Sequence, residues 1–394
     1  MINKKPIASN NSIPNRFNLA TEIIFGLDSI QQLPKEGAKL GQRVLVVSGR
    51  NWIIKSGVLT QILNILKEAQ FEVSVFSEIE PEPSLQTVAR GLEVARSNGV
   101  NWVLGIGGGS AMDAAKAIAG LYNQSLPVEK YFYGAEITQP GIPVLTVPTT
   151  SGSGAEVTVN SVLSDTEKGV KQSIRSVYLT PKITIVDPKL TLSNSPQLTA
   201  YSGFDALVQA IESFTSNGAT PFTDIYAYEA IKNIGNNLLT VYQDGSNLEA
   251  RTAMSLGSLM AGIALTNARL GAVHGLAHSI GIRTKQPHGL VCAVLLVPVM
   301  RYNIAVCDRK YALMAQAFGH NIDGMDSLDA AAQGIKTIMA IQKKLGIPTR
   351  LSSLGVKEED FQSIAEEGLL SGSTKANPRP VSLEVFLKIL RENY

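Results

Sequence analysis

The sequence predicts an α/β domain over residues 18–190, followed by an all-α domain over residues 191–394. The chain has 394 residues, which is more than one hydrophobic core usually supports. Up to about residue 190, short apolar runs alternate with segments of helical period, a pattern typical of a parallel sheet with crossover helices. Beyond Pro188 the segments become long and keep the helical period but lose most strand signals, which favours a purely helical domain.

The expected elements of the α/β domain follow one another in a regular order. Residues 1–17 are polar and rich in Asn, Ser and Pro, and we expect them to form a flexible lead-in. Ser84 is the expected N-cap of a helix that ends at Gly99. Strands are predicted at 43–49, 72–79, 102–109, 143–150 and 183–188, with helices at 52–70, 84–99 and 110–122. The helical domain is predicted to begin with helices at 198–216, 222–244 and 249–267.

Composition excludes several classes of protein. The net charge is +2 with no basic block, so neither nucleic acid nor an anionic membrane is an expected partner. Cys292 and Cys307 are the only cysteines, which fits a reducing compartment without a disulfide framework. The N-terminus lacks the apolar core of a signal peptide. The apolar run 289–300 contains Pro298 and is too short for a bilayer. We therefore expect a cytoplasmic protein.

A glycine-rich stretch, "GIGGGSAMDAAKAIA" at 105–119, follows a predicted strand and opens a helix. Glycines let a backbone approach a ligand closely, and a helix N-terminus attracts an anion such as a pyrophosphate. Ser110 is the expected N-cap, and it also breaks the GxGxxG pattern, while no Gly-Lys-Ser/Thr ends the stretch. The alternative is a tight turn that only serves packing. A second polar loop, "PTTSGSGAEVT" at 148–158, also follows an apolar run, and such loops bind ligands at the carboxyl ends of parallel strands.

Three of the four histidines lie within fifteen residues, at 274, 278 and 288. His274 and His278 are four residues apart, as are Asp205 and Gln209 on another predicted helix, so each pair shares a helix face. An aspartate and several imidazoles suit a divalent cation. The alternative is that they are ordinary core or surface residues, which is what we expect of His320.

Together these segments resemble the iron-containing (group III) alcohol dehydrogenase family. The resemblance covers about residues 20–394 and implies a dinucleotide-binding α/β domain followed by an all-helical domain, the dehydroquinate synthase-like fold. It also implies a homo-oligomer, which we expect to be a homodimer. The matching segments, in family order, are "GGGSAMDAAKAIA", "PTTSGSGAEVT", "IVDPKLT", "SGFDALVQAIESF", "NARLGAVHGLAHSIG" and "PHGLVCAVLLVPVMRYN".

The resemblance implies which residues bind the cofactor. The Gly-Gly-Ser turn would hold the pyrophosphate, and the Thr-Thr pair with the following hydroxyl would line the cofactor. A lysine before the last strand matches Lys171, although Lys168 is close by. The residues implied are Gly108, Gly109, Ser110, Asp113, Thr149, Thr150, Ser153 and Lys171.

The resemblance also implies a metal site in the helical domain, on Asp205, His274, His288 and the residue four after Asp205. That residue is Gln209, where the family has a histidine. An amide oxygen can bind a metal, but it is neutral and a weaker ligand than imidazole. The implied ion is Fe²⁺, with Zn²⁺ or another divalent ion as the alternative. His278 matches a histidine near the nicotinamide that helps to move protons, and we expect it to be catalytic.

The implied reaction is a reversible hydride transfer between NAD(P)(H) and a small alcohol or aldehyde, with the metal as Lewis acid. Because Gln209 departs from the family pattern, a metal-independent reductase of the maleylacetate reductase type is one alternative. A lyase or polyol-phosphate dehydrogenase on the same fold is another, but such enzymes need basic residues, and those near the ligand segments are chiefly Arg269 and Arg283. A non-catalytic nucleotide-binding protein is the third alternative.

The end of the strand at 43–49 predicts the choice of cofactor. An acidic residue at a strand end binds the ribose 2′-OH of NAD and repels the 2′-phosphate of NADP. Here the strand ends in Ser48, Gly49 and Arg50, without a carboxylate. We therefore expect these three residues to contact the cofactor and NADP to be preferred over NAD.

Overall fold

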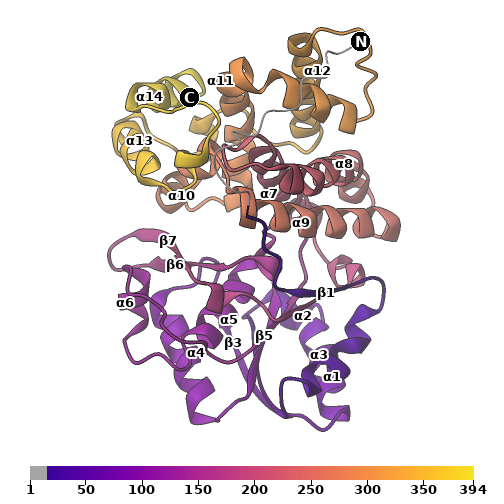
Figure 1. The fold of residues 1–394 in the computed structure, drawn as a ribbon, viewed down its shortest axis with the longest axis vertical. Helices are drawn as coiled ribbons and strands as arrows, with labels where there is room; N and C mark the ends of the chain where they lie inside the picture. Colours follow the sequence, from indigo (N-terminus) through magenta and orange to yellow (C-terminus); the bar gives the residue numbers. More distant parts are fainter. Residues whose placement is uncertain (1–15) are drawn as a thin grey trace. The chain divides into compact units, whose positions relative to one another are not determined.

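A computed structural model describes residues 16–394, which form two compact units (Figure 1). The α/β unit comprises residues 20–202 and 244–255, and the helical unit comprises residues 203–243 and 256–394 with the described residues up to Leu19. Most of the predicted lead-in lies outside the described residues. Phe17 is described, and its ring stacks on Tyr226 with 5.7 Å between centroids. The sequence predicted that the α/β domain ends at residue 190. In the structure the first segment of the α/β unit ends twelve residues later, at Ser202.

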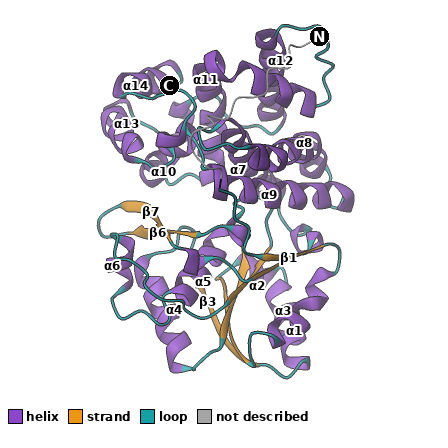
Figure 2. Cartoon of the chain, viewed as in Figure 1, coloured by secondary structure: helices purple, strands orange, loops and turns teal. Residues whose placement is uncertain are grey.

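The α/β unit contains a six-stranded sheet in the order β1-β8-β5-β4-β2-β3. Figure 2 shows its strands in orange, with helices around them. Every neighbouring pair is parallel, so the predicted fold class is confirmed. The central strand β4 is buried along its whole length, as expected for a parallel strand covered on both faces. The strands are β1 (Glu22–Phe25), β2 (Arg43–Gly49), β3 (Glu72–Ile79), β4 (Trp102–Gly107), β5 (Val144–Pro148) and β8 (Ile183–Val186).

Helices cover both faces of this sheet. Leu45, Val47 and Val103 face one hydrophobic core with helices α4, α5 and α6. Their sequence neighbours Val44 and Val46 face a second core with helices α1 and α3, because successive side chains of a strand point to opposite faces. The helices are α1 (Leu33–Ala38), α2 (Trp52–Lys55), α3 (Val58–Glu68), α4 (Leu85–Ser97), α5 (Gly109–Gly120) and α6 (Val128–Phe132).

The helix boundaries agree with the sequence at some positions and differ at others. Ser84 caps α4 as predicted, since its Oγ accepts from the amide of Thr87 at 3.1 Å. The helix expected over 52–70 is divided in two at Gly57, whose φ of +79° is left-handed. The N-cap of α5 is Gly108 rather than Ser110. That prediction was wrong because the last glycine, Gly109, already belongs to the helix, so the N-cap lies two residues earlier in the sequence.

Three strands of the α/β unit have weak sequence signals and were not predicted. Strand β1 has only four residues. Strands β6 (Asn160–Asp165) and β7 (Val170–Arg175) form a separate antiparallel pair, joined by a turn in which Gly169 has φ +65°. β7 contains only two apolar residues, which is too few for a recognisable strand pattern. The 3-10 helices of this half are η1 (Ser29–Gln32), η2 (Ala155–Val157), η3 (Val177–Leu179) and η4 (Pro188–Thr191).

Residues 191–394, all described, contain helices and no strand. α11 runs for 30 residues around the apolar segment 289–300, longer than that segment alone suggested, and Pro298 lies inside it. By length and composition it could cross a membrane, but 72% of its most apolar window is buried inside the protein. The helices are α7 (Pro196–Thr215), α8 (Pro221–Gln243), α9 (Leu248–Ala268), α10 (Ala272–Thr284), α11 (His288–Ala317), α12 (Ser327–Lys344), α13 (Phe361–Leu370) and α14 (Leu383–Glu392), with η5 (Leu351–Leu354), η6 (Glu358–Asp360) and η7 (Thr374–Ala376).

Glu156, in η2, predicts a pH-dependent stability. Burial raises the pKa of Glu156 from its usual 4.5 to about 7. Because the folded pKa is the higher one, ionisation destabilises the protein increasingly as the pH rises from 4.5 to 7. Glu156→Gln should therefore raise the free energy of unfolding at pH 8 by about 3 kcal/mol, and this gain should disappear at pH 4.5. Thermal melts across this range measure it, with the exposed Glu358→Gln as control; an equal gain at both pH values would contradict the explanation.

Candidate functional site

The carboxyl ends of three neighbouring strands bring the predicted cofactor residues to one edge of the sheet. β4 lies between β2 and β5. The strand after β2 in the chain, β3, pairs with one edge of β2, whereas the next strand, β4, pairs with its opposite edge. The direction in which strands are added to the sheet therefore reverses between β2 and β4. Such a reversal creates the crevice in which open α/β sheets bind ligands. The segments that follow these strands are 48–50, 107–110 and 148–153.

The glycine turn after β4 lies directly against the hydroxyl loop after β5. The amide of Thr149 donates to the carbonyl of Gly107 at 2.9 Å. A Cβ on Gly109 would come within 2.6 Å of Ser153 Oγ, and one on Gly108 within 3.5 Å of Thr150 Oγ1. The turn and the loop therefore form one surface of backbone amides and hydroxyls at the N-terminus of α5, which suits a phosphate group.

Lys171 and Ser110 are connected through Glu82. The amide of Glu82 donates to Ser110 Oγ at 3.2 Å, and Lys171 Nζ pairs with the Glu82 carboxylate at 2.5 Å. Lys168 instead pairs with Glu129 at 2.9 Å on the surface. Of the two lysines considered from the sequence, Lys171 is the one that lies beside the glycine turn.

Asp113 is engaged inside the α/β unit. Its carboxylate pairs with the fully buried Lys116 at 2.7 Å and accepts from the amide of Val162 at 3.0 Å. Burial raises the pKa of Asp113, and the nearby Lys116 ammonium opposes that rise. These contacts fasten α5 to β6, so Asp113 holds the helix whose first turn carries the glycines.

Arg50 follows β2 and pairs with a carboxylate from the neighbouring strand. Its Nη2 lies 3.1 Å from Glu80 Oε2. The other oxygen of Glu80 accepts from the amide of Ser84 and the hydroxyl of Thr87, both at 2.9 Å. Burial favours the protonated acid, but these hydrogen bonds outweigh it and lower the pKa of Glu80. Ser48, two residues before Arg50, is buried.

The helical unit brings three of the predicted metal ligands together from three helices. Asp205 lies on α7, His274 on α10, and His288 is the first residue of α11. Asp205 Oδ1 is 3.5 Å from His274 Nε2 and 3.8 Å from His288 Nε2. Asp205 and His274 are buried, whereas the side chain of His288 is 26% exposed. Donor atoms from distant parts of the chain thus converge on one point.

Glu212 decides which nitrogen of His274 faces this point. Its Oε2 lies 2.7 Å from His274 Nδ1, so Nδ1 is the nitrogen that donates to Glu212, and Nε2 is the nitrogen that faces Asp205. Burial acts to lower the pKa of His274, but the acidic neighbours Cys292, Asp205 and Glu212 raise it well above its usual value. Among the described residues, Asp205 Oδ1 and His274 Nε2 are buried without a hydrogen-bond partner. Two such atoms facing each other fit a divalent cation.

Gln209 lies beside Asp205 on the same helix. Its Nε2 donates to Asp205 Oδ2 at 3.1 Å, while its Oε1 is buried without a hydrogen-bond partner among the described residues. His278 is half-buried on α10, and its ring stacks on that of His288 with 5.2 Å between centroids. His320 lies elsewhere, where its two ring nitrogens contact Thr337 and Gln333.

Both halves of the chain match models of one protein family. Residues 20–188 match the model described as iron-containing alcohol dehydrogenase. Residues 199–394 match the C-terminal model of the Fe-containing alcohol dehydrogenase family. The chain belongs to the iron-containing alcohol dehydrogenase family.

Relatives match almost the whole length of this family member. The 1,3-propanediol dehydrogenase of Klebsiella pneumoniae is 39% identical over 90% of this chain and 92% of its own. The NAD-dependent methanol dehydrogenase of Bacillus methanolicus is 30% identical (93% and 97%), and the NADPH-dependent butanol dehydrogenase of Clostridium saccharobutylicum is 34% identical (95% and 96%). The crystal structure of a 1,3-propanediol oxidoreductase superposes with a TM-score of 0.93 at 36% identity, covering 97% of this chain and 100% of that one.

Membership makes this iron-containing alcohol dehydrogenase an NAD(P)-dependent oxidoreductase of alcohols and aldehydes. The structure also adds three residues that sequence reasoning did not select. Glu212 follows Asp205 by seven residues, the spacing of two helical turns on one face. Cys292 follows His288 by one turn and lies in the same cluster. Glu80 comes directly after β3. The helical spacing in the sequence could have identified Glu212 and Cys292. Glu80 could be found only from the pairing of the strands, which the sequence does not give.

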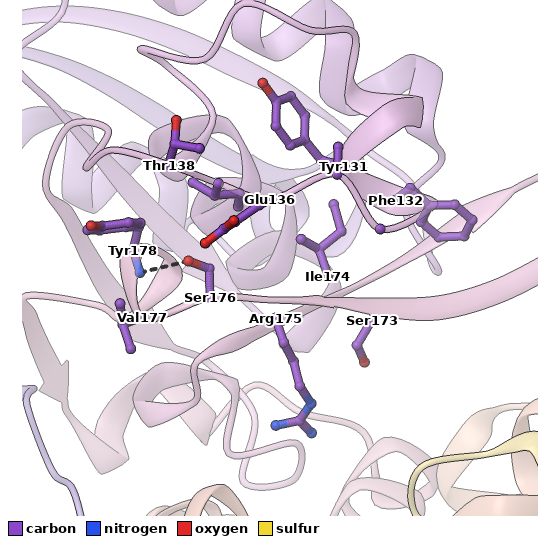
Figure 3. A pocket seen from close by; sticks show the side chains of 13 residues that line it. Tyr131, Phe132, Glu136, Thr138, Ser173, Ile174, Arg175, Ser176, Val177 and Tyr178 are labelled. Atoms are coloured by element: carbon purple, nitrogen blue, oxygen red, sulfur yellow. Dashed lines mark hydrogen bonds between the residues drawn. The ribbon is translucent and has the colours of Figure 1, made fainter.

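A hollow of about 540 Å³ lies elsewhere in the α/β unit, between the segments 131–138 and 173–178. Figure 3 shows Glu136 pointing toward Ser176, while the guanidinium of Arg175 points away from them. None of the residues of the glycine turn lines it. Its position therefore gives it no part in the cofactor site described above.

Gly109→Ala tests the glycine turn. The new Cβ would come within 2.6 Å of Ser153 Oγ and 2.8 Å of Ser153 Cβ, so the hydroxyl loop must move. Overpacking of this kind costs about 1–3 kcal/mol, and we expect the Kd of the nicotinamide cofactor to rise about tenfold or more. Fluorescence titration with NADPH measures this. Gly372→Ala, where a Cβ meets open space, should leave Kd unchanged; an unchanged Kd in Gly109→Ala would remove the turn from the cofactor site.

Proposed function

We propose that the protein transfers a hydride reversibly between NAD(P)(H) and a small, uncharged alcohol or aldehyde, using a divalent metal in the helical unit. The observation that carries the proposal is the convergence of Asp205, His274 and His288, whose donor atoms lie within 4.8 Å of one another. A metal at this point supplies Lewis-acid chemistry, which polarises the oxygen of the substrate. We take the ion to be Fe²⁺ or another divalent metal such as Zn²⁺.

The α/β unit is proposed to bind the cofactor through its sheet edge. Backbone amides of Gly108 and Gly109 and the N-terminus of α5 would hold the pyrophosphate. The hydroxyls of Thr149, Thr150, Ser110 and Ser153 surround that turn, and Thr149 Oγ1 is buried without a hydrogen-bond partner among the described residues. Lys171 lies beside Ser110, to which it is connected through Glu82. Asp113 acts by fixing α5.

The helical unit is proposed to orient the substrate oxygen and move its proton. Asp205, His274 and His288 would hold the metal, and Glu212 keeps His274 in the tautomer that leaves Nε2 available. Gln209 steadies Asp205 through its amide nitrogen. His278, half-buried and stacked on His288, is proposed to exchange a proton with the substrate or with a water between them.

Charge favours an uncharged substrate. Arg283 is neutralised by Glu367 at 2.6 Å, which leaves it little attraction for a phosphate or carboxylate. A polyol-phosphate dehydrogenase or a lyase of anionic sugars needs such a cation, so these alternatives are less well supported. Relatives named for propanediol, methanol and butanol act on uncharged alcohols, and we propose the same substrate class here.

We also propose that the protein is cytoplasmic and forms a homo-oligomer.

Asp205→Ala tests the role of the metal. Loss of the only carboxylate among the three converging ligands should abolish metal retention. Because Lewis-acid polarisation contributes several kcal/mol, kcat for aldehyde reduction should fall by about 100-fold or more. Metal analysis before and after dialysis against chelator, with an aldehyde panel, measures both. His320→Ala, a histidine outside the cluster, is the control. A protein that is metal-free as purified and indifferent to both chelator and Asp205→Ala would instead be a metal-independent reductase.

Arg50→Ala tests the choice of cofactor. A hydrogen bond to a charged group contributes about 1.5–3 kcal/mol, so kcat/KM with NADPH should fall about 10- to 100-fold while kcat/KM with NADH hardly changes. Arg43→Ala, at the other end of β2, should alter neither. If the wild-type protein uses NADH as efficiently as NADPH, the predicted preference is wrong, and the Glu80 carboxylate beside Arg50 gives the physical reason.

A further inference from the structure

Cys292 lies inside the cluster of metal-binding atoms. It is one helical turn after His288 on α11, and its Sγ is 3.5 Å from His288 Nε2. The residue is fully buried. Its Sγ lies within 4.8 Å of donor atoms of Asp205, His274 and His288, and those three atoms also lie within 4.8 Å of one another. The cluster therefore contains four possible metal ligands, one with oxygen, two with nitrogen and one with sulfur. From the sequence, the expected fourth ligand was the amide of Gln209 instead of a thiol.

Three separations between these donors are close to those of a tetrahedral site. Zinc binds imidazole at about 2.0–2.1 Å and thiolate at about 2.3 Å, so neighbouring ligand atoms in a tetrahedron lie about 3.3–3.6 Å apart. Two measured separations are 3.5 Å, from Asp205 Oδ1 to His274 Nε2 and from Cys292 Sγ to His288 Nε2. A third, from Asp205 Oδ1 to His288 Nε2, is 3.8 Å. Small side-chain movements would close the four atoms around one ion.

Gln209 is engaged differently. Its contact with Asp205 is made by the amide nitrogen, a donor that cannot bind a metal. That hydrogen bond holds Asp205 Oδ2 and leaves Oδ1 facing the two histidines. A neutral amide oxygen is also a poorer ligand for a transition metal than a thiolate.

The other cysteine shows what an ordinary buried thiol looks like in the same helix. Cys307 is 5% exposed and belongs to no group of metal-binding atoms among the described residues. A buried cysteine usually behaves as a small apolar residue. Cys292 differs because the buried Asp205 Oδ1 and His274 Nε2, neither of which has a hydrogen-bond partner among the described residues, belong to the same cluster.

We propose that Cys292 is the fourth protein ligand of the metal, in place of the imidazole that Gln209 does not supply. This proposal rests on the metal site proposed above. As the bond from Sγ to the ion forms, the thiol proton leaves to solvent. A thiolate beside two imidazoles and a carboxylate is a donor set that favours Zn²⁺ over Fe²⁺ more strongly than imidazoles and carboxylate alone. Gln209 is then a positioning residue that acts through Asp205.

Cobalt spectroscopy tests the proposal without reference to catalysis. The full-length protein is stripped of metal and loaded with Co²⁺, whose thiolate complexes absorb in the near ultraviolet by charge transfer. The wild-type protein should show this absorption at one equivalent of Co²⁺. Cys292→Ser should lose it, whereas Cys307→Ser, which removes the only other thiol, should keep it. A wild-type spectrum without this absorption would already overturn the proposal, so the test does not depend only on the folding of a variant.

Metal affinity provides a second readout. Loss of a supporting residue typically weakens metal binding about 10- to 100-fold. Gln209→Ala should fall in that range and keep the charge-transfer absorption. Cys292→Ser should weaken Zn²⁺ at least as much and lower the ratio of Zn²⁺ to Fe²⁺ affinity, as measured by competition with a chelator.

The outcomes separate the two proposals. One equivalent of Co²⁺ bound without thiolate absorption, with unchanged affinity in Cys292→Ser, overturns the role of Cys292 and leaves the metal site in place. No binding of Co²⁺, Zn²⁺ or Fe²⁺ by the wild-type protein overturns both the ligand and the proposed metal site.

Discussion

The buried carboxylate of Glu212 holds the centre of the helical unit together. It accepts from the amide of Val273 at 2.7 Å and contacts the amide and Nδ1 of His274. These amides belong to the first turn of α10, whose N-cap, Gly271, has no side chain to satisfy them. A Cβ on Gly271 would come within 2.7 Å of Glu212 Oε1, so the glycine makes room for the carboxylate. One side chain thus sets the start of α10 and the direction of a proposed metal ligand.

That interaction explains why the helices around the site cannot be altered independently. Removing Glu212 would leave amide groups of a buried helix end unsatisfied, and it would release the imidazole that faces Asp205. Breaking a buried charged contact of this kind typically costs about 3–5 kcal/mol. Asp205 and Glu212 are two turns apart on α7, so one helix supplies both a proposed metal ligand and the group that orients His274.

The sequence predicted those parts of the fold that are governed by local patterns. The buried strands of the α/β unit read as continuous β-branched runs, because parallel strands are covered on both faces. Ser84 was predictable as a cap from its position before a helical period. The hairpin β6–β7 was not, because its alternation is weak and its pairing is antiparallel beside a parallel sheet. Gly108, not Ser110, is the N-cap of α5, and the glycines on both sides of this boundary leave no side-chain signal that marks it.

For the site, spacing was sufficient where the partners share a helix and insufficient where they do not. Asp205, His274 and His288 were selected by spacing and by family resemblance, and the structure brings them together. Cys292 could not be selected from the sequence, because it lies in an apolar segment where a cysteine is expected to be an ordinary core residue. Its neighbours become apparent only from the packing of α11 against α10 and α7. Glu80 was hidden for the same reason, because its contact with Arg50 depends on which strand lies beside β2.

The charges around the metal site explain how a glutamine can stand where the family has a histidine. Glu212 is already balanced by the Nδ1–H of His274 and by backbone amides. A divalent ion bound as proposed above would face Asp205 and Cys292. Two anionic ligands neutralise the ion, whereas an aspartate with three imidazoles leaves one positive charge. A buried neutral site has a smaller desolvation cost, but it polarises a substrate oxygen less strongly. The hydrogen bond from the Gln209 amide to Asp205 Oδ2 withdraws negative charge from the carboxylate. The ion would therefore keep more of its ability to polarise a substrate oxygen. Gln209 and Cys292 are therefore best understood as a coupled pair.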